Sequence, residues 1–194
     1  MGTRLLLAAA VLAAASVPSA AQPLSAPFEL LPGQRAAPFG NQVPRMIANY
    51  GRAAPGIGIS GQPTVAGIEA LHALGFAVMV DLRQPDEPGV AAEAARAADL
   101  GLKRLSVPMP GEPGPALEAF LDQLSGILEE KGNYPLLLNC GSANRAAAAW
   151  ALYRARRGVP ARVAIEEGRA LGLTSREALV RAALGLGPAP APAR

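Results

Sequence analysis

The chain of 194 residues contains a single cysteine, Cys140, and a single histidine, His72. A lone cysteine excludes any disulfide within the chain. One cysteine and one histidine also cannot supply the ligands of a closed zinc site. A closed zinc site is therefore excluded, and we expect neither a metal nor another cofactor.

The chain also lacks a strong net charge and long apolar segments. Its formal net charge is only +3, which is too small to indicate a nucleic-acid partner. Outside the N-terminus, no segment approaches the roughly 20 apolar residues that a membrane-spanning helix needs. We expect neither nucleic-acid binding nor a membrane span.

The N-terminal segment has the pattern of an export signal. Arg4 precedes an unbroken apolar stretch over residues 5–15, and small residues, Ser19 and Ala21, occupy the −3 and −1 positions of a cleavage site. The apolar stretch is too short to cross a bilayer. The sequence predicts a signal peptide over residues 1–21 and a mature chain that is periplasmic or secreted.

The remaining chain is divided by composition. Residues 22–48 are rich in proline, glycine and alanine without a clear period, which predicts an N-terminal linker or extension. Residues 49–184 are expected to form one domain. Residues 185–194 form a proline- and alanine-rich tail that we expect to be disordered.

Within that domain, short apolar runs alternate with helical patterns. Strands are predicted at residues 57–60, 76–82, 102–107 and 136–138. Helices are predicted from Pro63 to a cap at Gly75 and over residues 90–100, 116–131, 145–157 and 159–171, with Thr174 and Glu177 as the capping box of a last helix to about Leu184. This alternation indicates an α/β fold with a mainly parallel central sheet flanked by helices. The loops 83–89, 108–115 and 140–145 then meet at the carboxyl edge of the sheet, where such folds bind ligands.

Cys140 lies in the last of these loops, between a buried strand and an alanine-rich helix, and Arg145 follows it five positions later. The N–H groups and dipole of a helix N-terminus favour a bound anion and would favour the thiolate form of the sulfur. A guanidinium can hold two oxygens of an oxyanion. The alternative is an inert buried cysteine, although such residues normally lie inside apolar runs rather than at a polar exit.

Four segments carry a resemblance to a known family. They are residues 57–63 (IGISGQP), 74–83 (LGFAVMVDLR) and 107–110 (VPMP), and the loop from Cys140 to Arg145 with the helix through Trp150. Together they resemble the tyrosine-phosphatase-like proteins and, more closely, the beta-lactamase-hydrolase-like phosphatase and sulfurtransferase group. The resemblance implies the cysteine-phosphatase fold, with Cys140 as nucleophile, Arg145 as phosphate clamp and Glu112, in the loop 108–115, as general acid. It implies that the backbone of Gly141, Ser142, Ala143, Asn144 and Arg145 cradles the phosphate.

Several positions depart from the usual family pattern. Four residues, rather than five, separate the cysteine from the arginine, which is the loop size of a rhodanese. Asn139 replaces the common histidine, and Ala146 replaces the common serine or threonine. Asp86 and Glu87 remain alternative general acids.

Other polar residues near the loop keep two interpretations each. Asp81 could orient Arg145 or cap a loop, and Ser142 and Asn144 could steady the loop or touch the substrate.

The sequence thus leaves three functions open. The first is an exported phosphatase that acts on a phosphorylated small molecule or phosphoprotein through a phosphocysteine intermediate. The second is a rhodanese-like sulfurtransferase that carries a persulfide on Cys140. The third is a catalytically weak module that binds anions or phosphopeptides.

Overall fold

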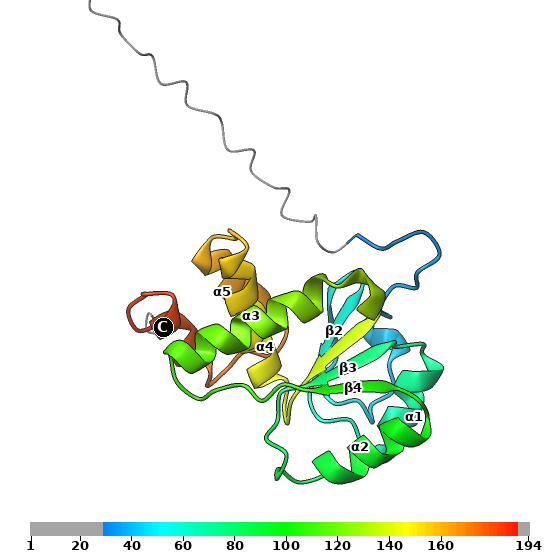
Figure 1. Cartoon of the computed structure of the whole chain (residues 1–194). Helices are drawn as coiled ribbons and strands as arrows, with labels where there is room; N and C mark the ends of the chain where they lie inside the picture. Colours follow the sequence, from blue (N-terminus) through cyan, green and yellow to red (C-terminus); the bar gives the residue numbers. More distant parts are fainter. Residues whose placement is uncertain (1–28, 190–194) are drawn as a thin grey trace, which may run out of the picture.

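The computed structural model describes residues 29–189 of the chain, and the predicted signal peptide lies outside them. A five-stranded sheet with the order β1-β2-β5-β3-β4 separates two groups of helices (Figure 1). Strands β2, β5, β3 and β4 are parallel, and β1 pairs antiparallel with β2 at one edge. The predicted α/β class is confirmed. The strands are β1 (Gly51–Ala54), β2 (Ile57–Ser60), β3 (Val78–Asp81), β4 (Lys103–Ser106) and β5 (Leu136–Asn139).

Helices cover both faces of this sheet, with α1 and α2 on one side and the longer α3 and α4 on the other (Figure 1). Helices α5 and α6 pack against α4. Within residues 29–189, no helix is both long enough and apolar enough to cross a membrane. The helices are α1 (Val65–Ala73), α2 (Val90–Asp99), α3 (Pro115–Glu129), α4 (Asn144–Arg156), α5 (Ala161–Ala170) and α6 (Glu177–Ala183), with short 3-10 turns η2 (Gly40–Gln42) and η3 (Lys131–Asn133).

The central strands supply both hydrophobic cores, because successive side chains of a strand point to opposite faces. Val80 and Leu138 pack in the core beneath α3 and α4. Met79 and Leu137 belong to the second core, with Ile68 of α1. Strand β5 is therefore buried on both faces and paired on both edges, so the residue that follows it starts from a rigid position.

Strand β1 is an element that the sequence does not indicate. Its residues, Gly-Arg-Ala-Ala, have low strand propensity and no apolar alternation. The strand forms because Gly51 and Arg52 pair with Ile59 and Gly58 of the neighbouring strand. Pairing partners, and not local propensity, decide its conformation.

The capping box expected at the last helix is wrong. Helix α6 begins at Glu177, its N-cap is Arg176, and no side-chain cap is present. The carboxamide of Asn144 on α4 instead accepts hydrogen bonds from the backbone N–H groups of Thr174, at 2.9 Å, and Arg176, at 3.3 Å. A tertiary contact thus takes the place of the local cap. The expected cap of the first helix, by contrast, is present: Gly75 follows α1 with a φ of +82°.

Candidate active site

Cys140 directly follows the central strand β5, and helix α4 begins four residues later. Its backbone N–H donates to the carbonyl of Ser60 on the adjacent strand at 3.3 Å. The cysteine is only 1% exposed, whereas Gly141 and Ser142 after it are exposed. Burial alone fits an inert cysteine equally well, so the surroundings of the sulfur have to separate the two interpretations.

The loop after Cys140 turns its carbonyl groups toward neighbouring segments. The carbonyl of Gly141 accepts from the N–H of Gln62 at 3.1 Å, and that of Ser142 accepts from the side chain of Asn49 at 3.2 Å. Among residues 29–189, no hydrogen bond uses the N–H of Gly141 or Ser142 as its donor. The first N–H groups of α4 also lack partners within the helix. These donors can serve an anion bound in the loop.

Ala143 closes this loop in a strained conformation. It is fully buried, and its φ of +74° and ψ of −19° are left-handed. Residues other than glycine rarely adopt this region, at a cost of about 1–3 kcal/mol. Residues held in such conformations cluster at functional sites, where the surrounding structure supports them.

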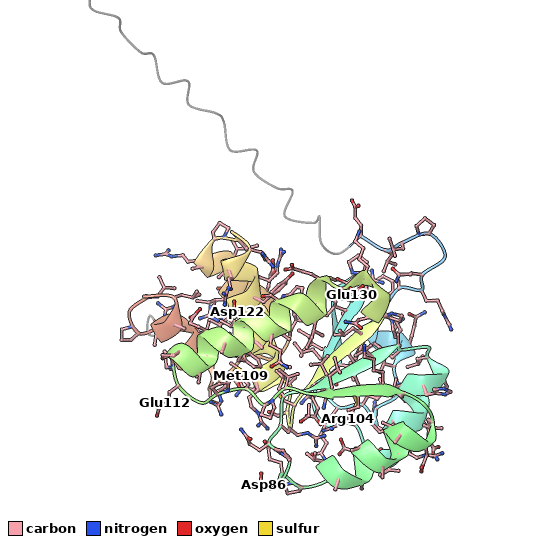
Figure 2. The ribbon with its side chains drawn as sticks, viewed as in Figure 1. Asp86, Arg104, Met109, Glu112, Asp122 and Glu130 are labelled. Carbon is pink, nitrogen blue, oxygen red and sulfur yellow. The ribbon has the colours of Figure 1, made fainter. Side chains whose placement is uncertain are left out.

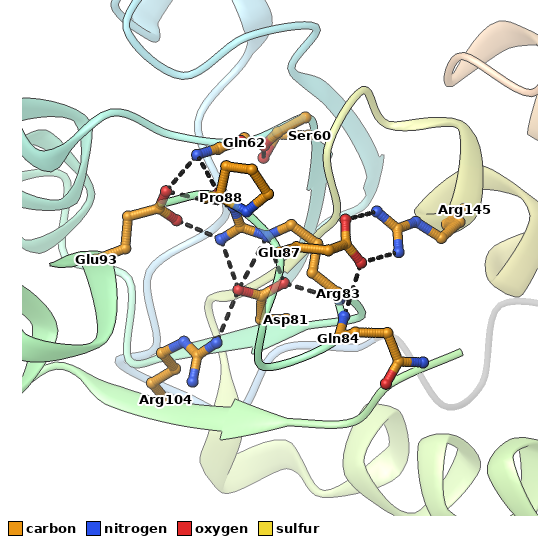
Figure 3. Close-up of polar contacts among 11 residues, drawn as sticks. Ser60, Gln62, Asp81, Arg83, Gln84, Glu87, Pro88, Glu93, Arg104 and Arg145 are labelled. Carbon is orange, nitrogen blue, oxygen red and sulfur yellow. Dashed lines mark hydrogen bonds and ion pairs between the residues drawn. The ribbon is translucent and has the colours of Figure 1, made fainter. Parts of the chain in front are cut away.

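Arg145 lies in the first turn of α4 and is held by Glu87, which comes from the loop after β3. Its Nη1 donates to one carboxylate oxygen of Glu87 at 2.5 Å and its Nη2 to the other at 2.6 Å (Figure 3). These hydrogen bonds lower the pKa of Glu87 and raise the pKa of Arg145. The Cys140 thiol contributes, more weakly, to the raised pKa of Arg145. A Cβ added at Gly141 would lie 3.5 Å from Nη2 of Arg145, so the guanidinium lies close to the loop that begins at Cys140.

The contact of Glu87 bears on the choice of general acid. A carboxylate with a lowered pKa and both oxygens bound to a guanidinium is a poor proton donor. Glu112 and Asp86 are exposed, and Figure 2 shows both carboxylates pointing outward from the tips of their loops. The contact with Arg145 disfavours Glu87 as the general acid and leaves Glu112 and Asp86 as the candidates.

The structure also gives the contacts of three further polar residues that the sequence leaves with two interpretations each. Asp81 does not contact Arg145; it is fully buried and pairs with Arg83, at 2.7 Å, and Arg104, at 2.9 Å. Asn144 steadies structure, because its amide also donates to the hydroxyl of Ser175 at 2.7 Å. Ser142 is exposed beside a hollow of about 460 Å³, which Asn49 and Thr174 also line.

Asn139, immediately before the cysteine, is an anomaly within the described part of the chain. It is fully buried, and both its amide oxygen and its amide nitrogen lack a hydrogen-bond partner there. Asp81 and Ser60 are its neighbours across the strand pairs on either side. Such unpaired buried groups are costly and are therefore uncommon in folded proteins.

The sequence analysis did not assign a role to Gln62, although it lies in the motif 57–63 that supports the resemblance. Its side chain and backbone contact two loops of the site at once. The signal available in the sequence was its place at the carboxyl end of β2, next to the predicted binding edge.

The parallel sheet, with the Cys140 loop between β5 and α4, can be compared with proteins of known structure. No family model matches the chain, and no curated protein matches it. Solved structures do share the fold. The core catalytic domain of the PP-IP phosphatase SIW14 from S. cerevisiae, in complex with citrate, superposes with a TM-score of 0.60 at 19% identity, over 70% of this chain and 83% of that one.

TpbA from P. aeruginosa has a TM-score of 0.57 at 22% identity, over 78% of this chain and 91% of the other. A further structure of TpbA is in complex with pTyr. Tk-PTP in its active form has a TM-score of 0.56 at 19% identity, over 71% of this chain and 95% of the other. The fold implied by the sequence motifs is confirmed.

Proposed function

We propose that this chain is a cysteine-dependent phosphatase that hydrolyses phosphate monoesters through a phosphocysteine intermediate. The observation that carries the proposal is Arg145, held by both oxygens of Glu87 and lying close to Gly141 in the loop that begins at Cys140. A guanidinium has five N–H donors, and Glu87 accepts from two nitrogens, so donors remain for phosphate oxygens. The fold shared with a PP-IP phosphatase and with TpbA, solved with pTyr, supports this choice.

The reaction divides into two displacements at phosphorus. The Cys140 thiolate attacks the phosphorus, the bond to the ester oxygen breaks, and Glu112 gives its proton to the leaving oxygen. In the second step, Glu112 takes a proton from a water molecule as that water attacks the phosphorus of the thiophosphate. The bond between phosphorus and sulfur breaks, and Cys140 leaves as a thiolate. Arg145 and the N–H groups of the loop stabilise the equatorial oxygens in both steps.

The short loop favours a second candidate, a sulfurtransferase. Only four residues separate Cys140 from Arg145, which makes a smaller ring of N–H donors than the classical five-residue spacing. In that reaction the thiolate takes the outer sulfur of thiosulfate, sulfite leaves, and cyanide removes the sulfur as thiocyanate. The third hypothesis, a weak anion- or phosphopeptide-binding module, is supported by Ala146, which supplies no hydroxyl for the leaving thiolate.

One assay separates these functions. The chain from Gln22 onward is tested for hydrolysis of an aryl phosphate and for sulfur transfer from thiosulfate to cyanide, with Cys140→Ser as the variant. We expect hydrolysis by the wild type, none by the variant, and unchanged binding of inorganic phosphate, because only the nucleophile is lost. Near-normal hydrolysis by Cys140→Ser would refute the covalent mechanism, and sulfur transfer without hydrolysis would favour the second candidate.

We also propose that the protein acts outside the cytoplasm, in the periplasm or as a secreted protein. Arg4, the apolar residues 5–15 and the small residues ending at Ala21 support this location. Mass spectrometry of the protein from its native host is expected to show a chain that starts near Gln22. Cytosolic protein that retains Met1 would refute export.

A further inference from the structure

A cluster of buried charges lies beneath the two loops that bear Cys140 and Glu87. Arg83, Asp81 and Glu93 are each 2% exposed or less. Arg83 donates to Asp81 at 2.7 Å and pairs closely with Glu93, and Arg104 donates to Asp81 at 2.9 Å (Figure 3). Two carboxylates thus balance two guanidinium groups. Because a buried charge without a partner is strongly destabilising, these four side chains are expected to keep their positions relative to one another.

Gln62 connects this cluster of buried charges to the loop of Glu87 and to the loop of Cys140. Its side-chain Nε2 donates to Oε1 of Glu93 at 2.6 Å and to the carbonyl of Pro88 at 3.2 Å. Its backbone N–H donates to the carbonyl of Gly141 at 3.1 Å. One residue therefore contacts the buried cluster, the loop that bears Glu87 and the loop that bears the nucleophile.

The packing around this amide is close. Gly89 has a φ of +83°, and a Cβ added there would lie 2.2 Å from Nε2 of Gln62 and 2.7 Å from Oε1 of Glu93. Only glycine fits this approach without displacing the amide. The position of Gln62 is thus set by its neighbours and is not one of several equivalent rotamers.

The consequence for the site follows from the order of the chain. Pro88 is the neighbour of Glu87, so a fixed carbonyl at Pro88 restricts the backbone from which the Glu87 carboxylate reaches Arg145. On the other side, Gly141 is the neighbour of Cys140. Through these two contacts, Gln62 restricts the position of the Glu87–Arg145 pair relative to Cys140.

We propose that Gln62 is a positioning residue that couples the Cys140 loop to the Glu87–Arg145 pair. The effect on turnover rests on the proposed phosphatase function. Gln62 is half-buried and belongs to neither hydrophobic core. Its side-chain amide can therefore be removed with little loss of hydrophobic contact.

The test uses Gln62→Met, which keeps the length of the side chain and the backbone bond to Gly141 but removes both side-chain hydrogen bonds. Gln123→Met is the matched control, because Gln123 is exposed on α3 next to Asp122, which pairs with Arg156 at the end of α4 opposite Arg145. We expect kcat for an aryl phosphate to fall about 10-fold in Gln62→Met with KM changed less than twofold, since positioning errors act on the transition state. Gln123→Met is expected to match the wild type.

A double-mutant cycle tests whether Gln62 acts through Glu87. If it does, Gln62→Met combined with Glu87→Gln loses little more kcat than Glu87→Gln alone. Multiplicative losses in kcat would overturn the coupling. A kcat in Gln62→Met equal to that of the wild type would overturn the proposal outright.

Hydrogen exchange separates a failure of this inference from a failure of the proposed function. We expect Gln62→Met, but not Gln123→Met, to increase exchange at the hydrogen-bonded amides of Glu87 and Cys140, one in each loop. If the wild type hydrolyses no phosphate ester, the phosphatase proposal fails, and the exchange rates still decide whether Gln62 ties the two loops. Unchanged exchange at both amides would refute the tie.

Discussion

Arg145 and Glu87 are 58 residues apart in the chain, yet the guanidinium meets both oxygens of the carboxylate at 2.5 and 2.6 Å. Both side chains keep part of their surface exposed, at 19% and 29%. The pair therefore lies at the mouth of the site and not in the core. For the proposed phosphatase function, this pair holds the guanidinium close to the Cys140 loop without a substrate, so little reorganisation would be needed on binding.

Substitution of Arg145 by lysine tests the clamp. Lysine keeps the positive charge but loses the planar fork that holds two oxygens. We expect kcat to fall by about 10²-fold, whereas the affinity for substrate falls less, because the retained charge still attracts the ground state. Steady-state kinetics with an aryl phosphate measure both. An unchanged kcat would mean that the loop only binds anions, and the binding-module hypothesis would then gain support.

The Glu87 carboxylate is expected to make stability depend on pH in the acid range. Arg145 lowers the pKa of Glu87 in the folded state below its usual value of 4.5. Stabilisation from the pair is therefore present above the unfolded pKa and is lost as the pH falls through the folded pKa. At pH 7, Glu87→Gln should lower Tm slightly, on the order of 2 °C for a partly exposed pair.

That difference in Tm between wild type and Glu87→Gln should shrink as the pH is lowered below 4.5. Thermal melts from pH 7 to pH 2.5 measure it. A difference that stays constant over this range would show that the carboxylate charge does not stabilise the fold.

The general acid is tested with esters of different leaving groups. Glu112→Gln should slow alkyl phosphates much more than activated aryl phosphates, because a good leaving group departs without a proton. The expected loss is about 10²-fold for the poor leaving group. Asp86→Asn is the companion variant, from the other exposed loop at the same edge. If Asp86→Asn shows the leaving-group dependence and Glu112→Gln does not, the assignment moves to Asp86.

Asn139 offers a test of the unpaired amide beneath the loop. Both of its side-chain polar atoms are buried without a hydrogen-bond partner among the described residues. Replacing an unpaired buried polar group with an apolar one of similar shape is nearly neutral or stabilising. We expect Asn139→Leu to leave Tm unchanged or to raise it by a few degrees. A large fall in Tm would show that the amide has a partner that stabilises the fold.

Local patterns in the sequence were enough for the α/β class, four of the strands and the placement of Cys140 between a strand and a helix. Apolar runs such as residues 136–138 and glycine breaks such as Gly75 act within a few residues, so they can be interpreted without the fold. Thr174 and Glu177 show the limit of this approach: their spacing matches a capping box, yet the carboxamide of Asn144 takes its place.

The tertiary structure alone decided the partners in the site. Glu87 looked like a candidate acid because it is a carboxylate in the right loop, and Asp81 looked like a possible partner of Arg145. Which carboxylate reaches the guanidinium depends on how the loop after β3 folds back over a region where Gln62 and Arg83 both contact Glu93. Side chains that are far apart in the chain meet only after the parallel strands have paired. The sequence therefore identifies the chemical groups, and the sheet determines which of them touch.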